Sequence, residues 1–180
     1  MSFELKLVIM TALAVAIGAT LSTRRPPATS LSARVTSRSG GLVTVWLVVI
    51  AGALLMVGIV SHTLLRHVVQ IAPLVGAVSL GLRGSSLGVS AAVPLFGFWF
   101  LIMSAIWLFL LGVAQIVSGT FTSAEIALTV IIGAASVLGL AAAWRQSVTR
   151  TPARLFTVVG FAVLQLAAMW ISLQPFVARR

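Results

Sequence analysis

Apolar residues occur along this chain in long runs that are separated by short polar stretches. The runs at residues 41–61 and 125–144 match the roughly 20 residues that an α-helix needs to cross a hydrocarbon core. A longer run, 87–118, exceeds what one crossing needs, and another continues from residue 151 to about residue 177. The pattern predicts an all-α fold, a polytopic transmembrane helix bundle that forms a single domain over residues 1–180.

Local signals place the ends of several predicted helices. Within the run at 87–118 we expect the membrane part at residues 93–117, with Pro94 in its first turn, where a helix tolerates proline. Thr122 and Glu125 have the spacing of a capping box, so a helix should begin there. Pro152 follows a threonine, the pattern of a cap and a proline at the first helical position.

The first apolar run covers residues 7–21 and ends at a polar stretch that contains two successive prolines. We interpret this run as a first membrane helix. A cleavable signal peptide is the alternative, but Glu4 makes the preceding segment atypical of one. Residues 22–40, rich in Ser, Thr, Pro and Arg, show no sustained apolar period and are expected to form a polar basic loop.

Residues 62–83 either span the membrane or lie in its interface, because they combine polar residues with a mostly apolar second half. Cytoplasmic loops of membrane proteins carry an excess of basic residues, and this rule can distinguish five spans from six. With five spans, the twelve basic residues divide six against six. With six spans, one face carries eight: Arg24, Arg25, Arg34, Arg38, Arg83, Arg145, Arg150 and Arg154. The other face then carries Lys6, Arg66, Arg179 and Arg180. This asymmetry favours six spans, with both termini on the non-cytoplasmic side, over five spans with an interfacial 62–83 segment.

Composition agrees with a protein whose main solvent is lipid. Hydrophobic residues make up 60% of the 180 positions and charged residues only 8%, against about 25% charged in an ordinary soluble domain. The net charge of +10 does not indicate nucleic-acid binding, because the basic residues lie mostly at the ends of apolar runs. We therefore expect an integral protein of a plasma or inner membrane, with the lipid bilayer as a partner and no nucleic acid.

The residues that most enzymes use are scarce in this chain. Cysteine is absent, which excludes disulfides and thiolate metal sites, and Glu4 and Glu125 are the only carboxylates. No nucleotide-binding, hydrolase or metalloprotease motif occurs in the sequence. We assign no catalytic residues and no metal site, and a non-enzymatic role is favoured over an enzyme.

One group of polar residues, at positions 62–70, stands out from its apolar surroundings. On a continuous helix His62, Arg66 and Gln70 would follow one another along one face, with Thr63 and His67 beside them. Ionisable groups inside a membrane invite a hypothesis of an ion path or a ligand contact. The alternative is that Arg66 and the histidines reach the headgroups from a helix end.

We expect no cofactor. The alternative is a haem with His62 or His67 as one axial ligand and a second ligand from a partner chain. The two histidines are five positions apart, so on a helix they would project about 140° from each other. They are therefore badly placed to hold one metal ion together.

Other polar and small residues point to helix packing. Gln115 and Gln165 lie inside predicted spans, where their amides are expected to find partners on neighbouring helices. Ala135, Gly139 and Ala143 repeat at every fourth position, a spacing that permits close helix approach.

Three functional hypotheses follow from the sequence. The leading one is a small non-enzymatic membrane protein, either a homo-oligomeric bundle or an accessory subunit of a larger membrane complex. The second is a small transporter or channel lined by the polar residues at 62–70. The third is a haem-binding electron carrier or another membrane enzyme that uses His62 or His67.

Overall fold

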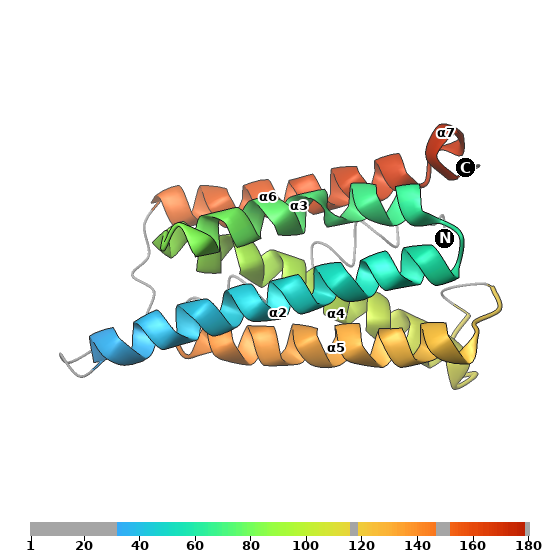
Figure 1. Cartoon of the computed structure of the whole chain (residues 1–180), viewed down its shortest axis with the longest axis horizontal. Helices are drawn as coiled ribbons and strands as arrows, with labels where there is room; N and C mark the ends of the chain where they lie inside the picture. The colour runs from blue at the N-terminus through green and yellow to red at the C-terminus, as the bar shows by residue number, and fades with distance from the viewer. Residues whose placement is uncertain (1–31, 116–118, 147–151, 179–180) are drawn as a thin grey trace.

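The structure, a computed structural model, describes residues 32–115, 119–146 and 152–178, and all its regular elements there are helices (Figure 1). They are α2 (Ser32–Val60), α3 (Leu64–Leu82), α4 (Ser86–Leu110), α5 (Ser123–Trp144), α6 (Pro152–Ser172) and the short α7 (Pro175–Ala178). Five of these six helices are long and apolar enough to cross a membrane. The all-helical fold is thereby confirmed, and the length and composition of these helices are compatible with a small integral membrane protein.

The five long helices run up and down through one bundle (Figure 1). We call the end that holds the turn at residues 61–63 the His62 end, and the end that holds the turn at residues 83–85 the Gly84 end. Helices α2, α4 and α6 run toward the His62 end, and α3 and α5 run back. Neighbours along the chain are therefore antiparallel, whereas α4 and α6 pack together as parallel helices.

Helix α4 crosses the bundle diagonally behind α2 (Figure 1) and contacts all the other long helices. It packs against α3, α5 and α6, and to a smaller extent against α2. It supplies the two largest fully buried side chains, Phe96 and Phe98, and also Leu95, and these pack in one core with Leu47, Ile50, Leu74 and Ile132 from the surrounding helices. The bundle is thus held by an apolar core around α4, while the outer faces of the other helices remain apolar and exposed.

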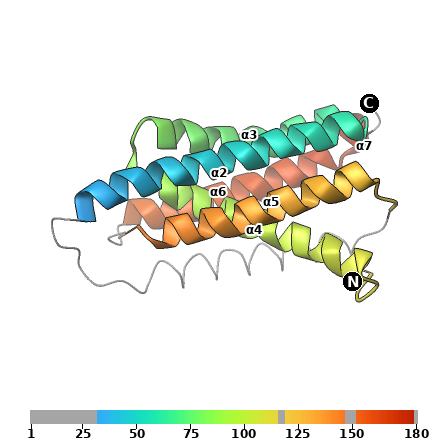
Figure 2. The same cartoon turned by 60° about the horizontal axis from the view of Figure 1, so that its bottom comes forward.

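Segment 62–83, for which the sequence left two possibilities open, contributes a full member of the bundle. Helix α3 lies alongside α2, α4 and α6 and does not cross an end of the bundle (Figures 1 and 2). This arrangement favours a span over an interfacial helix. The sixth predicted span, at residues 7–21, lies outside the described residues, so the count of six stays a prediction.

The predicted bounds of α4 were wrong at both ends. The helix begins at Ser86 because the hydroxyl of Ser85 caps it, accepting a hydrogen bond from the Leu87 N–H at 3.2 Å. It ends at Leu110, and Gly112 follows with φ +70°, the left-handed conformation that commonly ends helices. Pro94 consequently lies inside the helix, not in its first turn.

Two further boundaries differ from the prediction. Helix α2 begins at Ser32, within the segment expected to be a polar loop, although its membrane-spanning part begins only at Gly40. No proline follows Pro27 before that helix, so its backbone can continue past the apolar part. The last helix ends at Ser172, earlier than expected, and Pro175 begins α7.

The starts of α5 and α6 agree with the sequence patterns. Thr122 caps α5, and the Glu125 carboxylate accepts a hydrogen bond from the Thr122 backbone N–H at 2.7 Å, so the predicted capping box is complete. Helix α6 begins at Pro152, as predicted.

Candidate functional site

The structure divides the polar residues at 62–70 into two separate groups. His62 is not helical: it lies in the turn between α2 and α3 with φ 55°, and it is exposed. Thr63 is the N-cap residue of α3, and Arg66, His67 and Gln70 belong to the helix. The continuous stripe expected from the sequence therefore does not form, because the helix begins two residues after His62.

Side-chain hydrogen bonds hold the first group, at the turn. The Nδ1 atom of His67 lies 3.1 Å from the Thr63 carbonyl and 3.2 Å from the Thr63 hydroxyl. In the tautomer that carries its proton on Nδ1, the ring donates to the carbonyl. The Thr63 and Ser61 hydroxyls are 2.6 Å apart, and the Ser61 hydroxyl donates to the Val57 carbonyl at 2.7 Å. His67 thus takes part in a chain of bonds that closes the turn.

Gly58 explains why so short a turn can join α2 to α3. A Cβ atom at this position would lie 3.1 Å from the Cβ of His67 and from the Cα of Leu64. The absence of a side chain therefore lets the first turn of α3 pack directly against the last turn of α2. The hydroxyl of Ser61 stabilises the turn through its bonds to the Val57 carbonyl and the Thr63 hydroxyl.

Arg66 lies at the edge of the bundle. It is the third residue of α3, so its Cα is about 3 Å along the axis from the first residue of the helix at the His62 end. Its side chain is half-buried. From this position the guanidinium can reach the headgroup region while its methylene stem covers apolar surface.

The second group is a buried polar cluster between α3 and α6, which consists of Gln70, Gln165, Met169 and Ser172. The Gln70 amide nitrogen donates to the Ser172 hydroxyl at 2.9 Å and approaches the Met169 sulfur at 3.3 Å. The Gln165 amide nitrogen donates to the Gln70 backbone carbonyl at 3.3 Å. Gln165 and Ser172 are completely buried and Gln70 is 4% exposed, so the cluster joins two helices inside the bundle.

Two polar atoms near the centre of the bundle are buried without a hydrogen-bond partner in the described part of the chain. They are the amide oxygen of Gln165 and the indole nitrogen of Trp99. Each residue lies thirteen positions after the first residue of its helix, and the two helices are parallel neighbours. An unused acceptor and an unused donor therefore occur at similar depth.

The other packing residues named from the sequence have different placements. Ala135, Gly139 and Ala143 are all buried on one face of α5, and a Cβ atom at Gly139 would collide with the ring of Phe96 on α4. Gln115, expected inside a span, lies beyond the end of α4 and is exposed, because that helix stops at Leu110. Its placement does not support a role in helix packing.

The described residues contain no group of three or more histidine and carboxylate side chains that could hold a metal ion. His67 contacts Thr63 through Nδ1 in the turn, and Nε2 takes no part in those hydrogen bonds. The arrangement as a whole supplies hydrogen bonds between helices and a positive charge near one interface. Comparison with known proteins adds nothing to this, since no family model, curated protein or solved structure matches the chain.

Proposed function

We propose that this chain is a non-enzymatic structural protein or accessory subunit of a larger assembly in a plasma or inner membrane. The observation that supports the proposal is the buried polar cluster of Gln70, Gln165, Met169 and Ser172, whose polar groups bond between α3 and α6. Interhelical hydrogen bonds of this kind stabilise membrane helix bundles. Because these groups bond to one another, they serve the assembly of the bundle.

A transporter lined by residues 62–70 is the less favoured alternative. A pathway needs polar groups that follow one another across the membrane and remain free to contact the permeating species. Here the turn group lies at the His62 end and bonds to its own backbone, whereas Gln70 is enclosed between two helices. The two groups have different environments and different hydrogen-bond partners.

The outer surface of the bundle fits contact with lipid and with other membrane helices. Large apolar side chains are exposed on every long helix, for example Val48, Val75, Val137 and Phe156. Such a surface is suited to the bilayer and also to the packing of partner helices, including a second copy of the chain. We therefore propose the lipid bilayer and a larger membrane assembly as the partners of this chain.

Flux measurements in proteoliposomes test this proposal against the transporter. Wild-type protein and Gln70→Leu would be reconstituted in phosphatidylethanolamine and phosphatidylglycerol vesicles that contain a pH-sensitive dye, and a potassium diffusion potential would be imposed with valinomycin. We expect both samples to take up protons at the rate of protein-free vesicles. A faster rate for the wild type that Gln70→Leu abolishes would overturn the proposal in favour of a transport path.

The optical spectrum of the purified protein tests the haem alternative. After incubation with haemin and reduction, we expect the spectrum of free haem, with no shift of the Soret band. A shifted band that disappears in His67→Ala would instead identify a haem ligand on α3 and contradict the structural role.

A further inference from the structure

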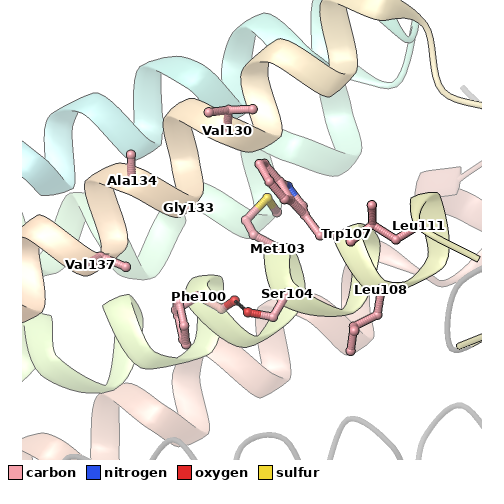
Figure 3. Close-up of a pocket in the computed structure, with 10 residues that line it drawn as sticks. All are labelled: Phe100, Met103, Ser104, Trp107, Leu108, Leu111, Val130, Gly133, Ala134 and Val137. Carbon is pink, nitrogen blue, oxygen red and sulfur yellow. Dashed lines mark hydrogen bonds between the residues drawn. The ribbon is translucent and has the colours of Figure 1, made fainter. Parts of the chain in front are cut away.

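A groove of about 490 Å³ opens on the outer surface between α4 and α5 (Figure 3). We call it the α4–α5 groove and define it by Phe100, Trp107 and Leu108 on α4 and by Val130, Ala134 and Val137 on α5. All six side chains are apolar or aromatic, and five of the six are substantially exposed large hydrophobic residues. The groove therefore accepts an apolar occupant.

The few polar groups along the α4–α5 groove already have partners. The Ser104 hydroxyl donates to the Phe100 carbonyl at 2.8 Å, a bond within α4 that Figure 3 draws. The Trp107 indole nitrogen donates to the Thr129 hydroxyl at 3.2 Å and so ties the aromatic wall of the groove to α5. Small residues, Gly133 and Ala134, line the opposite wall. Small residues allow a further helix to approach closely.

One wall of the groove belongs to α4, the helix that contacts all the other long helices. Helix α4 packs against α3, α5 and α6, and its remaining outer face lies between α5 and α6. Its other residues supply more of the buried core than those of any other helix. A helix added here would complete the enclosure of α4.

We propose that residues 7–21 of this chain pack into the α4–α5 groove as a further membrane helix. This run is apolar, and the ten residues at 22–31 join it to α2, which begins near the Gly84 end beside α5. Ten residues reach at most about 36 Å when extended, which is enough for the run to reach the α4–α5 groove. Such a tether gives the run a high effective concentration that a free partner lacks.

Residues 7–21 can reach the same position along the bundle axis as the α4–α5 groove. We set residue 21 level with Trp144, at the Gly84 end of α5. At 1.5 Å per residue, Met10 then lies about 16 Å from residue 21 toward the His62 end, and Ala134 lies about 15 Å from Trp144 in the same direction. The α4–α5 groove begins near Val137. Leu7, Met10 and Leu13, three of the large side chains of the run, would thus lie at the depth of the groove.

Disulfide crosslinking in native membranes tests the proposal, and the chain contains no cysteine that would interfere. Ala134→Cys would be combined with a cysteine at each of residues 9–12 in turn, so that one full helical turn is sampled. A matched series would replace Ala134→Cys by Val163→Cys, a lipid-facing position of α6 at similar depth. The pair Met103→Cys and Gly133→Cys reports that the bundle is folded, because the Met103 Cβ lies 3.6 Å from the position of a Cβ at residue 133.

We expect an intramolecular disulfide with Ala134→Cys at one or two of the four positions, in at least tenfold higher yield than with Val163→Cys. Three results, each in membranes where the reference pair forms, would overturn the proposal. Disulfide-linked dimers would assign the groove to a second copy, absence of any bond would leave it to lipid, and equal yields in both series would show that the run has no fixed place. None of these results bears on the flux measurements, so the two proposals are tested separately.

Discussion

The two buried glutamines, Gln70 and Gln165, have similar burial but unequal hydrogen bonding. Gln70 donates to Ser172 and accepts from Gln165, whereas the amide oxygen of Gln165 has no partner in the described part of the chain. An unpaired buried acceptor costs free energy, and replacing it by an apolar group of the same shape removes that cost. The two positions should therefore respond differently to the same substitution.

We predict that Gln165→Met changes the free energy of unfolding by less than about 0.5 kcal/mol, because one long hydrogen bond and one unpaired acceptor are lost together. Gln70→Met, the matched control, should cost about 1 kcal/mol, since it removes the donor to Ser172. Unfolding in mixed micelles with increasing SDS measures both values. A larger loss for Gln165→Met than for Gln70→Met would contradict this assignment.

Arg66 gives a second prediction at the residue scale. If its guanidinium reaches the headgroups, Arg66→Lys should unfold within about 0.5 kcal/mol of the wild type, because the ammonium reaches the same region. If Arg66 instead bonds inside the bundle, the lysine should be clearly destabilising, since it lacks the planar fork of donors. The same SDS titration separates the two cases, and a loss above about 2 kcal/mol would refute the headgroup role.

At the scale of helices, the sequence predicted correctly those helix starts that depend on residues close together in the chain. The capping box of Thr122 and Glu125 and the proline at the start of α6 are both formed by residues close in the chain. The start of α4 was missed because the cap of Ser85 was overlooked in favour of the length that one crossing requires. His62 was placed on a helix because its side-chain spacing fits one, yet the hydrogen bonds of Ser61 and Thr63 form a turn there.

The same reasoning explains which part of the candidate site escaped prediction. The sequence indicated that Gln165 belongs to helix packing, but it could not identify its partner, because Gln70 lies 95 positions away and only the fold brings the two together. Ser172 gave no signal at all, since one serine near a helix end resembles many others. Contacts between helices depend on rotation and register, which hydropathy does not determine.

Gly139 gives a prediction at this scale. We expect Gly139→Ala to destabilise the protein by about 1–3 kcal/mol, because the new methyl group would overlap the Phe96 ring and force α4 and α5 apart. Gly160→Ala is the matched control, since nothing lies within 4 Å of a Cβ atom there. Thermal unfolding in detergent compares them, and equal melting temperatures would show that the contact between α5 and Phe96 is unimportant.

At the scale of the whole molecule, the up-and-down order of the helices fixes which segments share a side. Thr120 lies between α4 and α5 at the His62 end, and Ala153 lies at the start of α6 at the Gly84 end. Basic residues predict that the Gly84 end is cytoplasmic. The side on which the N-terminus lies distinguishes five spans from six. An additional membrane helix before α2 would put the N-terminus on the side of Thr120, and without that helix it would lie on the side of Ala153.

Cysteine accessibility tests this topology. We predict that Thr120→Cys and Ser2→Cys react with an impermeant maleimide added to intact cells, whereas Ala153→Cys reacts only after the membrane is opened. Labelling of Ser2→Cys together with Ala153→Cys would mean that five spans are correct and six are not. Labelling of Thr120→Cys and Ala153→Cys from the same side would contradict the bundle itself.

The central claim is that the buried polar residues of this membrane bundle hold its helices together, and a double-mutant cycle on Gln70 and Ser172 tests it most directly. The unfolding free energies of wild type, Gln70→Leu, Ser172→Ala and the double variant would be measured in the same micelles. The hydrogen bond of 2.9 Å between α3 and α6 predicts a favourable coupling energy of about 0.6–1.7 kcal/mol. Strictly additive effects, with a coupling energy of zero within error, would show that this pair does not join the helices and would contradict the account.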